Sequence, residues 1–164
     1  MYDHERVLTP AIVAEISEVD AAILRDLRSR SLIDGFGAEG GNGRWKYSLA
    51  DATAIWIGKH LIQRGMVDRQ EAYLVGKLGA DEVLSVLRGN DAKENFLTVA
   101  RLGFFEGDEF HETGGTVKKW NKIPDDLPYD VYLTVDWKLT SSLAPEALKR
   151  AATDPEFVSN IGAR

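Results

Sequence analysis

The sequence contains no cysteine and no long apolar run. Without cysteine there can be no disulfide, no thiolate metal site and no cysteine nucleophile, which agrees with a reducing compartment. No apolar stretch approaches the ~18 residues that a membrane-spanning helix needs. The first residues, MYDHERVLTP, lack the basic and apolar segments of a secretion signal. We therefore expect a cytoplasmic protein without membrane attachment.

Positive charge is also scarce. The chain carries 20 Lys and Arg against 26 Asp and Glu, a net charge of −6, which argues against a protein that coats nucleic acid through bulk positive potential. The deficit is uneven, because residues 1–64 hold eight basic and nine acidic side chains while the remainder holds 12 and 17. Any contact with DNA is therefore expected from local basic clusters in the first part of the chain.

What is present is an ordinary globular composition. Of 164 residues 44% are hydrophobic and 28% are charged, so the chain can bury a core and form one domain or two small ones. We expect two domains, residues 1–66 and residues 67–164.

The segment from Thr9 onward predicts two short helices joined by a tight turn. Thr9 followed by Pro10 is typical of a helix start, because the hydroxyl accepts an orphan N–H and proline suits the first helical position. The first helix covers Ala11 to Ile16. Asp20 can cap a second helix that runs from Ala21 to about Arg30.

The second helix has two different sides. At 100° per residue the apolar residues Ile23, Leu24 and Leu27 fall on one side. The opposite side is small, polar and basic, and consists of Ala22, Arg25 and Ser29 flanked by Arg28 and Asp26. This pattern suits a helix that enters the major groove, where small residues permit close approach and Arg and Ser reach phosphates or base edges. An ordinary solvated face explains the pattern equally well.

A glycine-rich segment, residues 34–43, precedes the alternating basic and aromatic residues Arg44, Trp45, Lys46 and Tyr47. The segment lacks the Gly-Lys-Ser or Gly-Lys-Thr of a phosphate-binding loop. It predicts a flexible hairpin tip that leads into a basic strand, which is the shape of a wing laid against DNA. A third helix begins at Ser48, with Asp51 completing a capping box, and is expected to stop at Gly65.

From Thr9 to Met66 the order of these elements resembles the MerR-type winged helix-turn-helix family. The matching segments are AIVAEISEVDAAILRDLRSRSLID and RWKYSLADATAIWIGKHLIQRGM. The resemblance implies that Arg25 contacts DNA from the recognition helix and that Arg44, Trp45 and Lys46 form the wing strand. The chain departs from the family at Asp26 and Leu27, where many relatives have aromatic residues, and at Trp45, where many have arginine.

The second half predicts a small antiparallel sheet with flanking helices. Helices are expected at 69–78 and 81–88, because Gly76, Gly79 and Gly89 interrupt any longer one, although residues 82–88 also fit a strand. Strands are expected at 96–102, 104–111, 116–120 and 131–139, the last with clean alternation of apolar and polar residues. Pro145 starts a helix to about Ala152, and Asp154-Pro155 starts one more turn. The fold class is therefore α+β.

Other candidate sites in this half have simpler explanations. Glu106, Asp108, Glu109, His111 and Glu112 form an acidic cluster, but their spacing does not match a calcium loop. The three histidines are scattered, and Ser141-Ser142 lies in no nucleophile elbow. The aromatic residues Trp120, Tyr132 and Trp137 are expected in a core or interface. We expect no metal, no cofactor and no enzymatic activity.

These patterns together predict a transcription regulator that binds double-stranded DNA sequence-specifically as a homodimer, with dimerisation supplied by the acidic second half. They identify no small-molecule effector. Two alternatives remain open. The chain could be a phage-type DNA-processing protein resembling a terminase small subunit or an excisionase. It could also be a winged-helix protein interaction module, which Asp26 on the second helix would favour.

Overall fold

The computed structural model describes residues 2–41, 43–64, 68–106, 109–122 and 131–161; for residues 2, 99–106, 109–120 and 131–133 only the backbone is described. The chain has the α+β class expected from the sequence. In chain order its elements are η1 (Tyr2–His4), α1 (Pro10–Ser17), α2 (Ala21–Ser29), β1 (Ala38–Glu39), β2 (Trp45–Lys46), α3 (Leu49–Gln63), α4 (Arg69–Leu87), β3 (Phe96–Glu106), β4 (Glu109–Trp120), β5 (Val131–Asp136), α5 (Trp137–Ser142), α6 (Glu146–Thr153) and α7 (Pro155–Ile161).

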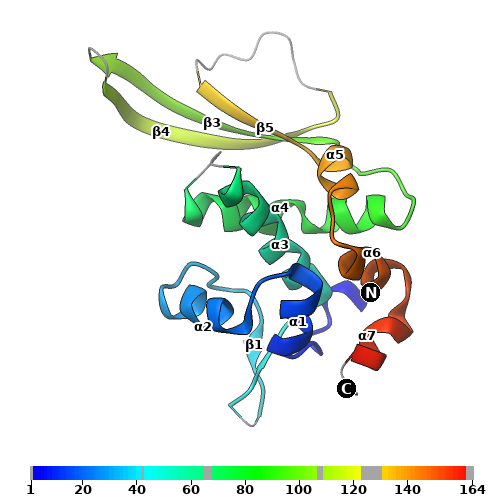
Figure 1. Cartoon of the computed structure of the whole chain (residues 1–164). Helices are drawn as coiled ribbons and strands as arrows, with labels where there is room; N and C mark the ends of the chain where they lie inside the picture. Colours follow the sequence, from blue (N-terminus) through cyan, green and yellow to red (C-terminus); the bar gives the residue numbers. More distant parts are fainter. Residues whose placement is uncertain (1, 42, 65–67, 107–108, 123–130, 162–164) are drawn as a thin grey trace.

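Helices α3 and α4 form the centre of the molecule. Figure 1 shows α1, α2 and the β1–β2 hairpin at one end and the sheet of β3, β4 and β5 at the other, with α6 and α7 beside α1. The buried apolar side chains form one cluster that extends in sequence from Leu8 to Val158. The expected domain boundary after residue 66 falls between α3 and α4, which pack against each other. No helix in the described part of the chain is long and apolar enough to cross a lipid bilayer.

The first three α-helices start where the sequence predicts, because each has a side-chain cap. The Thr9 hydroxyl accepts from the Ile12 N–H, and the Asp20 carboxylate accepts from the Ala22 N–H at 2.6 Å. Ser48 and Asp51 form a reciprocal capping box, with bonds of 3.0 and 2.8 Å. The expected stop of α3 at Gly65 lies outside the described residues.

The two helices expected at 69–78 and 81–88 are a single helix, α4, so both the break and the alternative strand were wrong. The helix continues through two glycines that lie where other elements come close. A Cβ at Gly76 would be 2.2 Å from the Ala54 carbonyl oxygen of α3, and one at Gly79 would be 2.1 Å from the Trp137 ring. A helical glycine costs about 1 kcal/mol in propensity. Here its lack of a side chain permits the close packing that offsets this cost.

The sheet has three antiparallel strands in the order β4-β3-β5. The strands expected at 104–111 and 116–120 have the wrong bounds, because β3 continues through Gly103 and β4 continues through Gly114 and Gly115. The register between β3 and β4 shifts between Leu102 and Gly103. Gly103 therefore accompanies an irregularity within a strand, where glycine is common, and does not end the strand.

The last strand is shorter than its alternating pattern indicates. Strand β5 ends at Asp136, whose carboxylate accepts from the Leu139 N–H at 3.0 Å and caps α5. Trp137 is fully buried as expected, but Leu139 is 63% exposed and is not part of the same face. An alternating pattern cannot distinguish a strand from a capped helical turn over its last few residues. The helices expected after Pro145 and Asp154 are present as α6 and α7.

Candidate nucleic-acid interface

A side chain of α3 stabilises the turn between α1 and α2. Glu18 ends α1 in a left-handed conformation with φ 54°, and its carbonyl oxygen accepts a 2.6 Å hydrogen bond from Lys59 Nζ. The Lys59 ammonium also lies 3.8 Å from the Glu18 carboxylate. Val19 in the turn is buried. The angle at which α2 leaves the turn is therefore set by core packing together with a charge at the carboxyl end of α1.

Helix α2 presents a small, polar face to solvent. Leu24 and Leu27 are buried, whereas Ala22, Arg25 and Ser29 are exposed, as the sequence predicts. Ile23, which the helical spacing places on the apolar side with Leu24 and Leu27, is 51% exposed. At 100° per residue it lies at the edge of that side.

Asp26 and Arg30 form an ion pair on this exposed face. Arg30 Nε donates to Asp26 Oδ1 at 2.9 Å, and the Ser29 hydroxyl donates to the Asp26 main-chain oxygen at 2.8 Å. The Asp26 carboxylate is thus accompanied by a guanidinium one turn away.

The hairpin after α2 carries the basic strand expected from the sequence. Ala38 pairs with Lys46 and Glu39 with Trp45, and the Gly40 N–H donates to the Arg44 carbonyl oxygen at 2.8 Å. Arg44 is exposed, while Trp45 and Lys46 are half-buried. Leu8 pairs with the end of this small sheet, since Leu8 and Tyr47 exchange two main-chain hydrogen bonds of 2.9 Å.

Glycine is required at the base of the hairpin. Gly37 has φ +68°, and a Cβ there would lie 2.7 Å from the Lys46 carbonyl oxygen and 2.9 Å from the Tyr47 ring. Glycine at this position therefore permits the close approach of the two hairpin strands.

Arg28 joins α2 to the hairpin. Its Nη1 donates to the Tyr47 hydroxyl, and its guanidinium lies 4.7 Å from the centre of the Trp45 ring. Burial raises the pKa of the Tyr47 hydroxyl, although the neighbouring Arg28 charge opposes this shift, so the phenol is neutral and available as an acceptor. Arg28, which is one of the residues expected to contact DNA, is half-buried and lies between α2 and the hairpin.

The structure brings every residue expected at the interface onto α2 or the adjoining hairpin strand. Sequence reasoning missed the roles of Lys59 and Arg30. The Asp26–Arg30 spacing of four residues could have indicated the second, whereas nothing local in the sequence connects Lys59 with Glu18. On this surface the basic side chains outnumber the acidic ones; they are Arg25, Arg28, Arg30, Arg44 and Lys46 against Asp20, Asp26 and Glu39.

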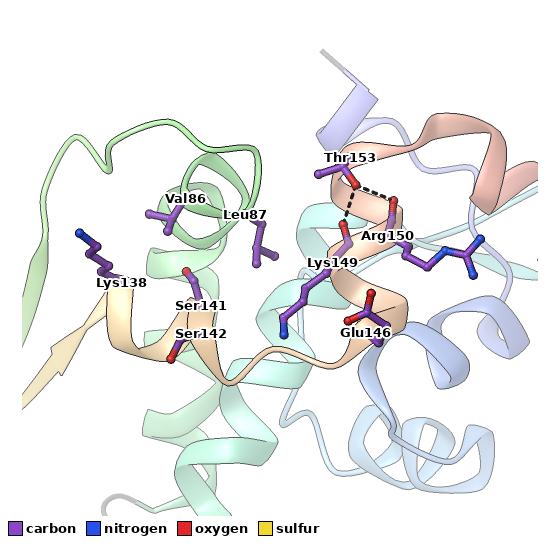
Figure 2. Close-up of a pocket in the computed structure, with 9 residues that line it drawn as sticks. All are labelled: Val86, Leu87, Lys138, Ser141, Ser142, Glu146, Lys149, Arg150 and Thr153. Atoms are coloured by element: carbon purple, nitrogen blue, oxygen red, sulfur yellow. Dashed lines mark hydrogen bonds between the residues drawn. The ribbon is translucent and has the colours of Figure 1, made fainter.

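A separate crevice of about 390 Å³ lies where α4, α5 and α6 meet (Figure 2). Its hydroxyls are committed to the main chain, since Ser141 donates to the Trp137 carbonyl, Ser142 to the Leu139 carbonyl and Thr153 to the Lys149 carbonyl. Figure 2 shows the Arg150 side chain directed away from the crevice, and its guanidinium lies 4.1 Å from the Phe157 ring centre. The lining residues therefore offer no set of polar groups aimed at one point.

A second concave region, of about 480 Å³, lies between the N-terminal segment, α3 and α4. It is lined by charges of both signs: His4 Nε2 lies 3.1 Å from Asp81, Arg6 Nε lies 3.9 Å from Asp51, and Lys77 Nζ lies 5.7 Å from the centre of the Phe36 ring. The described residues contain no cluster of three His, Asp or Glu side chains suited to a metal ion. The side chains of the acidic cluster at 106–112 lie outside the described residues.

Among the residues that the structure describes, the surface formed by α2 and the hairpin thus combines exposed basic groups with a small helix face supported by the core. A search of protein-family models finds no match to this sequence, and a search of curated proteins finds none either.

Proposed function

We propose that this chain binds double-stranded DNA sequence-specifically as a MerR-like winged helix-turn-helix protein and acts as a dimeric transcription regulator. Helix α2 is the recognition helix, and the β1–β2 hairpin is the wing. The observation that carries the proposal is the Arg28 link to Trp45 and Tyr47, because it joins the exposed face of α2 and the basic hairpin into one surface.

The residues on this surface suit the two kinds of contact that DNA recognition needs. Ala22 lets the helix backbone approach base edges, and the exposed Arg25 has the reach and the paired donors to bind guanine. Arg44 is exposed and Lys46 half-exposed on the hairpin. Their charges would neutralise phosphates, which supplies affinity without reading sequence. The negative net charge of the chain then limits binding that does not use this surface.

A second copy of the chain is part of the proposal for a geometric reason. Helix α2 is nine residues long, and a helix of this length reads only a few base pairs. Two copies related by a two-fold axis would read two half-sites, which multiplies both affinity and specificity.

The experiment is fluorescence anisotropy with duplexes selected from a random pool, at a stated low salt concentration and at physiological salt. Arg25→Ala is expected to weaken binding about tenfold or more and to relax preference at one position per half-site. Arg44→Ala is expected to weaken binding to all sequences similarly and to reduce the salt dependence by about one counterion.

Lys149→Ala on α6 removes the same charge away from the interface and is expected to leave affinity unchanged. Absence of any duplex binding at low salt contradicts the proposal. Regulation is tested separately, by placing the selected sequence over a reporter promoter and measuring transcript with and without the protein.

A further inference from the structure

One stripe of α2 lies directly opposite its buried residues. Leu24 and Leu27 define the inward side, and Ala22, Asp26 and Ser29 follow one another at spacings of four and three residues on the outward side. All three are exposed. If α2 lies in the major groove, this stripe is the part of the helix closest to the base edges.

Asp26 provides the hydrogen-bonding group at the centre of that stripe. Ala22 has no polar side-chain atom, and the Ser29 hydroxyl already donates to the Asp26 main-chain oxygen. Arg30 Nε occupies Asp26 Oδ1 at 2.9 Å, and no described residue donates to the other oxygen, Oδ2. The Asp26 side chain is 48% exposed, so a second acceptor oxygen remains available on this carboxylate while Arg30 engages the first.

We propose that Asp26 selects a cytosine in each half-site by accepting a hydrogen bond from its exocyclic N4 amino group. This inference rests on the proposed DNA binding. A carboxylate accepts hydrogen bonds and donates none, so it needs a donor on the base edge. Cytosine presents the N4 donor in the major groove, whereas guanine presents N7 and O6 acceptors and thymine presents an O4 acceptor. Adenine presents its N6 donor beside the N7 acceptor, which repels a carboxylate.

Arg30 makes this choice compatible with DNA. An unaccompanied carboxylate beside phosphates is repelled, whereas the guanidinium at 2.9 Å offsets its charge and leaves Oδ2 free to accept. The departure from the MerR pattern at Asp26 is then a determinant of specificity and not a loss of DNA binding.

The test compares the full-length chain with two variants by selection from random duplexes, followed by anisotropy on the selected site and its single-base changes. For the wild type, replacing one cytosine per half-site is expected to cost about tenfold in affinity. Asp26→Ala is expected to lose this preference at that position alone. Asp26→Asn is expected to move the preference to adenine, because an amide can bond both N6 and N7.

Glu156→Gln on α7 removes one negative charge elsewhere and is the control, expected to leave every position unchanged. The ion pair is exposed and contributes little to folding, so the variants are expected to fold. The inference is overturned if Asp26→Ala leaves all base preferences intact, or if it strengthens binding equally to all sequences. Failure of the wild type to bind any duplex overturns the proposed function itself.

Discussion

Among single residues, Arg28 has the largest expected effect on the interface, because it connects α2 and the hairpin through one side chain. Arg28→Ala removes a charge-assisted hydrogen bond to Tyr47 and the contact with the Trp45 ring, so we expect a loss of about 1–2 kcal/mol in the free energy of unfolding. DNA affinity is expected to fall while base preference is kept. Urea denaturation and duplex selection measure the two effects. Arg28→Lys keeps the charge but lacks the planar guanidinium, and full rescue by it would contradict this role.

A second arginine fastens the N-terminus to the rest of the chain. Arg88 Nη1 donates to Asp3 Oδ2 at 2.6 Å, Nη2 donates to the other carboxylate oxygen, and Nε donates to the Ala152 carbonyl oxygen at 2.8 Å. The hydrogen bond from Arg88 holds the pKa of Asp3 below its ordinary value, against the opposing effect of burial. The ion pair therefore stabilises the folded state most where Asp3 is ionised in both the folded and the unfolded chain.

The expected result is a pH-dependent effect of Asp3→Asn. At pH 7 the substitution should lower the free energy of unfolding by about 1–2 kcal/mol, a figure that allows for partial solvent screening. Because the folded pKa is lowered, the stabilisation is present above the ordinary pKa of about 4 and is lost as the pH falls through the lowered value. The difference between wild type and variant should then shrink toward zero in denaturation at low pH. A difference that is constant with pH would contradict the ion-pair explanation.

At the scale of elements, the path of α4 depends on the close approach of its neighbours. A Cβ at Gly79 would lie 2.1 Å from the Trp137 ring, which is fully buried. We expect Gly79→Ala to destabilise the fold by about 1–3 kcal/mol through overpacking, although alanine is the better helix former by about 1 kcal/mol. Gly41→Ala is the matched control, because nothing lies within 4 Å of the position of its Cβ. A stabilised Gly79→Ala variant in urea denaturation would show that Trp137 can move aside.

For the whole molecule, the described end of the sheet, at Leu97 and Val135, is covered by the same chain. Val135 on β5 is 4% exposed and belongs to the core cluster that also includes residues of α1, α3 and α4. Val135→Asp places an unpaired charge in that cluster and is expected to cost about 3 kcal/mol or more. Leu139→Asp, at a position that is 63% exposed, is expected to have little effect. Thermal unfolding measures both, and a Val135→Asp variant of unchanged stability would contradict an internal cover.

Dimerisation is also predicted for the whole molecule. Because Val135 is buried within one copy, its side chain is not available to the dimer interface. Light scattering at micromolar concentration, with and without the selected duplex, is expected to show a dimer in the bound state. A monomer under both conditions would contradict the dimeric form of the proposed function. It would leave open binding of a single copy to one half-site, which anisotropy would detect as a weaker, non-cooperative isotherm.

The features that depend on neighbours a few residues apart could be predicted from the sequence. Thr9, Asp20 and the Ser48–Asp51 pair place three helix starts, because each cap satisfies an N–H two or three residues away. The two faces of α2 were predicted for the same reason, since Leu24 and Leu27 repeat at helical spacing. The basic strand at Trp45 and Lys46 follows from its local pattern as well.

Close packing and the partners of individual side chains depend on atoms distant in sequence, so they follow only from the tertiary structure. Whether Gly79 ends a helix or permits close packing depends on Trp137, and the link from Arg28 to the hairpin depends on Tyr47. Ile23 is 51% exposed while the adjacent Leu24 is fully buried, a difference that helical spacing alone does not give. Sequence patterns predict the hydrogen bonds and the apolar face of a single helix or strand. Close packing and partner choice are set by which elements meet, and that is decided only when the whole chain has folded.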